Sequence, residues 1–314
     1  MKVLFPKVTI IMATYNREIY IVETLKSIIN QSFTNWECLI IDDGGTDNTV
    51  AVISPLLEED KRFQYLKRPE KYKKGLPGTR NYGLDLAKGD YVIFFDDDDI
   101  VHPLNLELCV LELSRNDVSF CRYIRNVFYD DFDYQFDMSK EYDTFFIGIN
   151  DVERLLNQDL PFNSCAVLWK KECFTNNRYV EHLLHAEEWE LYSRILSTGI
   201  KGISIEKSLF FARKHSNSMT GQYYRLDPIR TSSNVDAILL VLKNLQEKGL
   251  FSHSLIRYFV TISYGFKEYD LFNKFINLLQ LTFFEKIKWQ VFYATFPLRL
   301  SAYRIKKAIK TFNK

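Results

Sequence analysis

The sequence predicts an α/β fold, in which a mostly parallel, Rossmann-like sheet is flanked by helices and followed by a C-terminal helical region. Short apolar, β-branched runs alternate with segments of helical spacing along the first two thirds of the chain. Strands that are apolar along their whole length are typical of a parallel sheet that helices cover on both faces. Past about Asp227 the spacing is helical throughout. We therefore expect two domains, 1–225 and 226–314.

Each expected strand is a short apolar run that ends at polar or turn-forming residues. The strands are expected at 8–12, 36–41, 63–66, 91–95 and 166–169. Helices of the first domain are expected at 19–30, about 49–57, 79–87, 103–113 and 186–196. Asn48 and its neighbours can cap the second helix, and Gly89 is expected to stop the third.

Two further stretches complete the expected architecture. Residues 127–143 interleave Tyr, Phe and Asp, which indicates an irregular segment on the surface. The C-terminal region is expected to form helices at 235–248, 255–264, 270–281 and from 284 to the end.

Composition excludes several classes of protein. The formal net charge of +1 is too small for a general nucleic-acid binder, so no nucleic-acid partner is expected. The five cysteines form no C-x-x-C pair, so we expect reduced thiols in a cytoplasmic protein and no zinc site. The N-terminus is too short and polar for a signal peptide, and no apolar run is long enough for a membrane-spanning helix. No G-x-G-x-x-G follows the first strand, which excludes a dinucleotide oxidoreductase.

Acidic residues follow two of the predicted strands. Asp42 and Asp43 end the second strand, and the four consecutive residues Asp96 to Asp99 end the fourth. Ligands of α/β sheets bind at the carboxyl ends of the strands, and like charges this close repel unless something neutralises them. A solvated acidic turn is the simpler interpretation. A divalent cation, Mn²⁺ or Mg²⁺, that is held by one or two carboxylates and bridges to a diphosphate is the alternative.

Four sequence blocks resemble the family 2 glycosyltransferases. They are Val8 to Arg17 (VTIIMATYNR), Leu39 to Asp47 (LIIDDGGTD), Gly78 to Gly83 (GTRNYG) and Tyr91 to Asp99 (YVIFFDDDD), which is followed by Pro103. The blocks occur in the order and spacing of that family, and the resemblance covers roughly residues 6–220. It implies a GT-A fold and an inverting transfer of a sugar from a nucleotide-sugar donor.

The resemblance assigns the donor side of the site. Ala13 and Tyr15 would hold and stack the nucleobase, Asp43 would accept from the base N–H and favour uracil, and Arg80 would approach the base or the diphosphate. Asp96 and Asp98 match the D-x-D motif of the family. Asp98 would contact the metal and Asp96 would lie nearer the ribose or the metal's waters. Asp97 and Asp99 are alternative donor or metal residues, because in a run of four aspartates the D-x-D motif can be aligned one position later.

The resemblance also assigns the acceptor side. His185 to Tyr192 (HAEEWELY) resembles the acidic pair of the family, with Glu187 first and Glu188 where the family usually has Asp. Glu188 would then take the proton of the acceptor hydroxyl, because a sugar hydroxyl is a poor nucleophile without a base in hydrogen-bond reach. Asn163 and Trp189 are expected on the acceptor side. The charged first turn of an ordinary helix is the alternative interpretation.

The segment from Arg213 to Ser218 resembles the one that closes many family members over the donor. His215 would be a metal or diphosphate ligand there, and Arg213 and Lys214 would meet phosphate; a plain basic loop is the alternative. The sequence departs from the family pattern at Gly45, which is usually Ser, and at Val101, which is often Trp.

The C-terminal segment 284–314 mixes aromatic residues with bases. After Glu285 it holds eight Lys or Arg residues and no acid. Such a segment suits peripheral contact with an anionic membrane surface, although a helical cap with a solvated basic face fits equally well.

The sequence leaves the sugar and the acceptor unidentified. A saccharide or lipid-linked saccharide, in the synthesis of a bacterial surface polysaccharide, is the acceptor class that the resemblance suggests. A nucleotidyltransferase and a catalytically inactive sugar-nucleotide-binding protein are the alternative functions.

Overall fold

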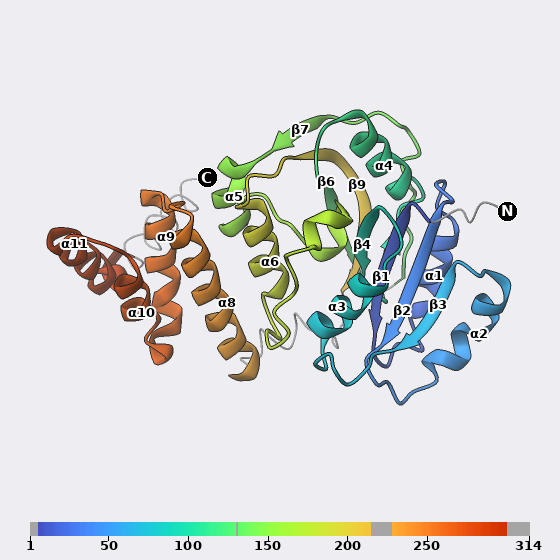
Figure 1. The fold of residues 1–314 in the computed structure, drawn as a ribbon, viewed down its shortest axis with the longest axis horizontal. Helices are drawn as coiled ribbons and strands as arrows, with labels where there is room; N and C mark the ends of the chain where they lie inside the picture. The colour runs from blue at the N-terminus through green and yellow to red at the C-terminus, as the bar shows by residue number, and fades with distance from the viewer. Residues whose placement is uncertain (1–5, 130, 215–227, 300–314) are drawn as a thin grey trace, which may run out of the picture. The chain divides into compact units, whose positions relative to one another are not determined.

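The computed structural model describes residues 6–129, 131–214 and 228–299 (Figure 1). By their contacts the residues form two compact units that divide between Ala237 and Ile238. The predicted boundary near 225 falls outside the described residues, so the domain limits stay a prediction.

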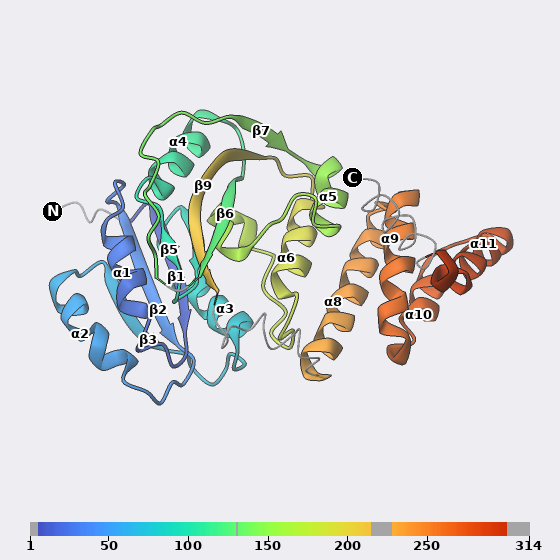
Figure 2. The ribbon, with the colours of Figure 1, turned by 180° about the vertical axis from the view of Figure 1, so that it is seen from behind.

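The first unit is built on a nine-stranded sheet with helices on both of its faces (Figures 1 and 2). The strand order is β3-β2-β1-β4-β8-β6-β9-β5, and β7 pairs with β9. Strands β1 to β4 pair in parallel, as do β6 and β9, whereas β8, β5 and β7 pair antiparallel. The strands are β1 Val8–Thr14, β2 Trp36–Asp42, β3 Phe63–Lys67, β4 Tyr91–Phe95, β5 Ile100–Val101, β6 Phe120–Tyr129, β7 Thr144–Ile147, β8 Val167–Lys170 and β9 Gly202–Lys214.

Side chains alternate between the two faces of the sheet, as strand geometry requires. Ile10 of β1 belongs to one buried cluster with Leu25 and Cys109, which lie on two helices that cover this face. On the other face Ile11 lies close to Gly83, which also belongs to a helix. The helices of this unit are α1 Ile21–Ile29, α2 Thr49–Glu59, α3 Leu76–Leu86, α4 Asn105–Arg115, α5 Val152–Leu156, α6 Glu187–Leu196 and the start of α8 Pro228–Glu247.

The structure corrects three of the sequence predictions. Helix α3 begins at Leu76, three residues before the predicted start, with a proline in its first turn. It ends at Leu86, one residue before the predicted end. Gly89, which was expected to stop the helix, has another role: a Cβ there would lie 2.6 Å from the backbone N of Thr9, so this glycine permits close packing. Strand β6 extends to Tyr129, so the irregular segment is shorter than predicted.

The described part of the second unit contains the rest of α8 and the α-helices α9 His253–Ser263, α10 Leu271–Leu278 and α11 Phe283–Ala294, with the 3₁₀ helix Tyr264–Tyr269 between α9 and α10. Its buried side chains include Phe259 of α9, Phe275 of α10 and Trp289 of α11. Among the described helices, none is both long enough and apolar enough to pass through a bilayer.

Candidate functional site

The site begins where β1 and β2 end, because both strands run in parallel and reach the same edge of the sheet. Asn16, in the loop after β1, has a positive φ of 55°, and its Oδ1 accepts hydrogen bonds from the backbone N–H groups of Thr46 (2.7 Å) and Asp47 (3.3 Å). Asp42 in turn accepts from the N–H of Gly45 at 2.8 Å. These bonds fix the two loops that carry the predicted nucleobase residues.

Asp43 is buried beside a cation that the sequence interpretation did not use. Its carboxylate accepts a hydrogen bond from Nε of Arg68 and another from the N–H of Gly75, at 2.8 Å. Tyr15 is 45% exposed and lies under Nζ of Lys74, 4.8 Å from the ring centre, while Ala13 is half-buried near the end of β1. An anchored carboxylate and an accessible ring at one strand edge suit a planar ligand with an N–H group.

The four aspartates after β4 do not form a solvated turn. Asp97 and Asp99 are only 6% and 3% exposed. Arg17, from the loop after β1, binds Asp97 with its Nε at 2.9 Å and Asp98 with a terminal nitrogen at 3.3 Å. Arg213 of β9 donates its backbone N–H to Asp99 at 2.8 Å and its Nε to the carbonyl oxygen of Asp98 at 3.0 Å.

The protein cations do not neutralise this cluster fully. Burial raises the pKa of Asp97 to about 7, with Asp98 adding to the rise and Arg17 opposing it. Burial, together with Asp96 and Asp98, also raises the pKa of Asp99 well above its ordinary value. Excess negative charge at the end of a buried strand is the condition under which a divalent cation is favoured.

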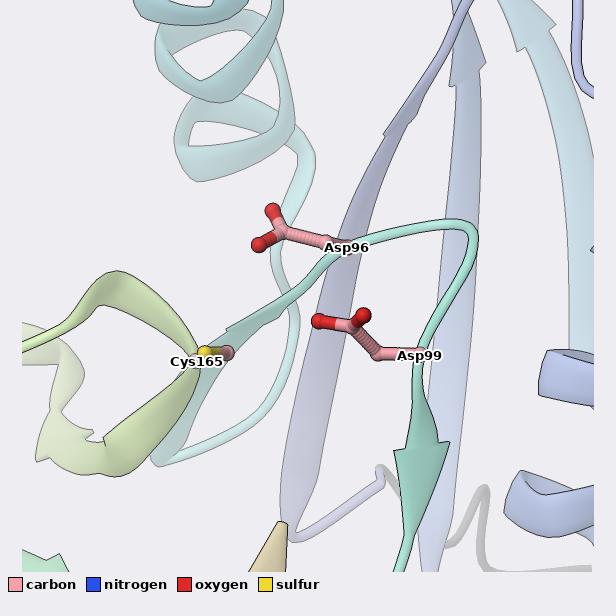
Figure 3. Close-up of side chains that lie close together, drawn as sticks. All are labelled: Asp96, Asp99 and Cys165. Atoms are coloured by element: carbon pink, nitrogen blue, oxygen red, sulfur yellow. The ribbon is translucent and has the colours of Figure 1, made fainter. Parts of the chain in front are cut away.

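The donor set of the cluster suits a hard cation. Carboxylate oxygens of Asp96 and Asp99 and the sulfur of Cys165 all lie within 4.8 Å of one another, and Figure 3 shows the two carboxylates next to the cysteine. Burial raises the pKa of the Cys165 thiol, so the sulfur stays protonated and is a poor ligand. Oxygen ligands therefore dominate, as Mg²⁺ or Mn²⁺ requires.

Arg80 of α3 connects the carboxylate turn to the acidic start of α6. Its side chain is 3% exposed, and one terminal nitrogen lies 3.1 Å from Asp96 Oδ1. The other terminal nitrogen lies 3.6 Å from Glu187 and 3.8 Å from Glu188, without a hydrogen bond to any described group. The guanidinium also lies 5.6 Å from the ring centres of Phe94 and Tyr179, which hold it in place.

Glu188 has an environment that suits a base. Its side chain is 29% exposed, yet the packing around it raises its pKa to about 7, with the neighbouring Glu187 adding to the rise and Arg80 opposing it. Burial raises the pKa of Glu187 as well. A carboxylate that titrates near neutral pH can accept a proton from a hydroxyl and release it again.

The backbone before Glu187 is held in an unusual conformation. Ala186 has a φ of 61°, which is uncommon for a residue with a side chain. Just before it, the backbone N–H groups of Leu184 and His185 donate to Oγ of Ser233 in α8, at 2.7 and 3.1 Å. Tertiary contacts therefore set the direction in which α6 starts, and with it the position of Glu188.

The two predicted acceptor residues, Asn163 and Trp189, lie near Glu188 in the chain or in space, and they differ in which of their groups are available to an acceptor. Asn163 is half-buried and immediately precedes Ser164, whose N–H donates to Glu188 at 3.3 Å and whose Oγ accepts from Arg80 at 3.0 Å. Trp189 donates its indole N–H to the carbonyl oxygen of Leu156 at 3.1 Å, so only its ring is left for an acceptor. His215 lies outside the described residues, and its predicted role stays a prediction.

The structure adds three arginines that the sequence interpretation did not assign. Arg17 binds Asp97 and Asp98, and Arg68 binds Asp43. Arg125 of β6 follows two register shifts, and its Nε is buried without a hydrogen-bond partner among the described residues. Burial lowers the pKa of Arg125, but nearby groups, among them Asp99, Asp96 and Glu188, raise it overall. Because β1 and β4 are parallel neighbours, the loops that follow them lie at the same edge of the sheet, and Arg17 could have been predicted as a partner of the aspartates. Nothing in the sequence marks the bulge before Arg125.

The comparisons with known sequences agree with the resemblance. A sequence model described as glycosyl transferase family 2 matches residues 9–172, just over half of the chain. The GalNAc(5)-diNAcBac-PP-undecaprenol beta-1,3-glucosyltransferase of Campylobacter jejuni is 40% identical over 94 residues, which are 30% of this chain and 30% of that relative. In this relative and in two further curated ones, the chain covers only 30% to 40% of the relative's own length.

Two solved structures share the fold. S. aureus TarS 1–349 in complex with UDP has a TM-score of 0.60 at 17% identity, over 87% of this chain and 81% of that one. The mannosyltransferase PcManGT from Pyrobaculum calidifontis, in complex with GDP-Man and Mn²⁺, has a TM-score of 0.53 at 16% identity, over 76% and 64%. At these identities the likeness shows the GT-A fold alone.

Proposed function

Because the chain belongs to glycosyl transferase family 2, we propose that it is an inverting glycosyltransferase that moves a sugar from a UDP-sugar to a hydroxyl group of a lipid-linked saccharide. One side chain carries this proposal. The buried Arg80 contacts Asp96, at the end of β4, and both Glu187 and Glu188, at the start of α6. One guanidinium thus contacts both a carboxylate of the donor side, Asp96, and the proposed base for the acceptor, Glu188.

The donor's nucleobase binds between the loops that follow β1 and β2. Asp43, which Arg68 and Gly75 hold in place, accepts the N–H of uracil, and Tyr15 stacks on the ring with Ala13 beneath it. The UDP in the TarS structure makes this base a reasonable choice, and the anchored acceptor atom of Asp43 favours it chemically.

Asp96 and Asp98 would hold the divalent cation of the donor complex, with Asp97 and Asp99 next to them on the donor side. The carboxylate of Asp99, which lies close to that of Asp96, is the alternative second ligand. When bound, Mn²⁺ or Mg²⁺ would supply Lewis-acid stabilisation of the charge that grows on the departing diphosphate. The raised pKa values of Asp97 and Asp99 support this role, because a dication would relieve the repulsion within the turn. The Mn²⁺ in the PcManGT complex is consistent with such an ion.

Glu188 acts as the general base. It accepts the proton of the acceptor hydroxyl while that oxygen forms a bond to the anomeric carbon of the sugar. The bond from that carbon to the diphosphate oxygen breaks on the opposite face, and UDP leaves with the bonding electron pair. One displacement inverts the anomeric centre. Glu187 and Arg80 position the base, and Asn163 and Trp189 contact the acceptor.

The acceptor class follows from the chemistry that the C. jejuni relative's name describes, a saccharide on undecaprenyl diphosphate. An enzyme with such an acceptor works at the membrane, so we place this protein at the cytoplasmic face of the cell membrane and assign the contact to residues 284–314.

A donor screen tests the proposal. The protein is incubated with UDP-, GDP- and dTDP-sugars and Mn²⁺, with and without a lipid-linked saccharide, and the released nucleotide is quantified. We expect UDP release that EDTA abolishes and that Glu188→Gln lowers strongly, while Glu172→Gln, an exposed glutamate on the same unit, leaves it unchanged.

The same screen separates the two alternatives. A nucleotidyltransferase would release pyrophosphate from a nucleoside triphosphate in the presence of a sugar phosphate. An inactive sugar-nucleotide-binding protein would bind a UDP-sugar without releasing UDP. Either result would overturn the proposal.

A further inference from the structure

Helix α11 presents large apolar side chains to solvent along one side. Phe283 is 72% exposed, Phe284 81%, Ile287 40% and Val291 57%. With 3.6 residues per turn, these four positions fall within an arc of about 100° on the helix surface. We call this set the apolar stripe. Leu298, which follows the helix, is also 74% exposed.

The opposite side of α11 already fills the core of the second unit. Trp289 is 3% exposed and lies 5.0 Å from the ring of His253 in α9. Tyr293 stacks on Phe272 of α10 at 4.0 Å. Figures 1 and 2 show α9, α10 and α11 side by side. The apolar stripe is therefore not needed to hold the unit together.

The helix is fixed at its N-terminus, so the stripe has a defined direction. The side chain of Thr282 accepts from the N–H of Glu285, and the carboxylate of Glu285 accepts from the N–H of Thr282 at 2.8 Å. This capping box also ties down the only acidic side chain of the helix at the positive end of its dipole.

Positive charge flanks the stripe. Lys286 and Lys288 lie on α11, one at each side of the stripe, and the chain after Glu285 holds eight Lys or Arg residues and no acid. A second copy of the chain is a poor occupant of such a surface, because a two-fold interface would bring cations of both copies near one another, and the chain after Glu285 has no acid to pair with them. Anionic lipid headgroups attract these cations, and the acyl boundary below them accommodates the apolar side chains.

We propose that the apolar stripe of α11 inserts into an anionic lipid surface, with the flanking cations on the headgroups. The proposal deepens the membrane assignment made above and rests on it for its biological setting. It replaces a general contact of residues 284–314 with one helix face, and it assigns Trp289 to the protein core instead of the lipid.

Vesicle co-sedimentation of the full chain tests the inference. The probes are vesicles of phosphatidylcholine alone and vesicles with about 30% phosphatidylglycerol. The stripe variant carries Phe284→Glu and Val291→Glu. The matched control carries Phe146→Glu, because Phe146 in β7 is also a large apolar residue, 65% exposed, in the other unit. Thermal unfolding of each variant verifies that it folds.

We expect the unmodified chain and the control to sediment with the anionic vesicles, and the stripe variant to partition at least about tenfold more weakly. Binding that is equal for both vesicle types, or equal for both variants, would overturn the inference. A wild-type dimer in light scattering that the stripe variant turns into a monomer would assign the stripe to a second copy and would also overturn it. Because sedimentation needs no turnover, its outcome is independent of whether the proposed transferase activity is found.

Discussion

Changing Glu188 to Gln should remove the proposed base while leaving the shape of the site intact. A general base contributes roughly 10²- to 10⁴-fold to rate, so kcat should fall by that factor with little change in KM for the donor. The control Glu172→Gln should have no effect, since Glu172 is exposed.

The pH dependence of the unmodified protein follows from the raised pKa of Glu188, about 7. The base must be ionised to accept a proton, so kcat/KM should rise with pH through that value. About a tenth of Glu188 is ionised one unit below its pKa and about nine tenths one unit above it, so kcat/KM should differ roughly tenfold between pH 6 and pH 8.

The contribution of Glu188 to the stability of the fold should decrease as the pH rises, whereas activity increases. A carboxyl whose pKa is raised in the folded state stabilises the fold below its ordinary pKa of 4.5, and this contribution is lost as the pH rises through about 7. Gln cannot ionise, so Glu188→Gln should raise the free energy of unfolding by about 1–3 kcal/mol at pH 8, and the difference should narrow below pH 5.

Steady-state kinetics over pH 5.5–9 with the UDP-release assay measures the loss of kcat in the variant and the pH dependence of kcat/KM in the unmodified protein. Thermal unfolding at pH 5 and pH 8 measures the change in stability. A variant that keeps more than a tenth of the wild-type kcat, or a kcat/KM that is flat from pH 6 to pH 8, would refute Glu188 as the base. The acidic start of α6 would then be a structural helix terminus.

Three further changes probe other parts of the site and fold. Asp43→Asn should raise KM for the UDP-sugar by about 10- to 100-fold, because a charged hydrogen bond to the base is lost; an unchanged KM would contradict the nucleobase assignment. Arg125→Gln should move the pH at which kcat/KM reaches half of its maximum to above 7, because a cation that favours ionised Glu188 is removed. An unchanged midpoint would contradict that role of Arg125. Gly83→Ala places a methyl group 2.5 Å from Cγ2 of Ile11, so it should lower the free energy of unfolding by about 1–3 kcal/mol, whereas Gly148→Ala meets nothing within 4 Å and should leave stability unchanged within about 0.5 kcal/mol in thermal unfolding.

The central strands were predictable because their side chains are apolar on both faces. Strands β1, β2 and β4 lie within two residues of their predicted limits, since a buried parallel strand leaves a continuous run that polar residues interrupt only at its ends. Strand β6 was not predicted as a strand, because its second half mixes buried Phe128 with the exposed Val127 and Tyr129 at the edge of the irregular segment. Its pairing with β9 depends on residues about 80 positions away, which local patterns do not reveal.

The acidic residues of the site could be found from the sequence, but their partners could not. Asp43 and Asp96 follow strands, and that position alone indicates a ligand-binding edge. Arg68, after β3, binds Asp43, and Arg125, on β6, lies near Asp96. These residues are distant in the sequence, so only the fold brings them together. The position of Glu188 also depends on Ala186 and Ser233, whose contacts set the start of α6 and leave no pattern in the sequence.

Calorimetric titration of the protein with UDP, in Mn²⁺ and then in EDTA, tests the central claim that the four-aspartate turn binds a divalent cation which holds the donor's diphosphate. The account predicts that UDP binds at least about a hundredfold more tightly with Mn²⁺ than in EDTA, and that Asp98→Asn removes this difference. Equal affinity in Mn²⁺ and EDTA, or an Asp98→Asn variant that keeps the full metal effect, would contradict it.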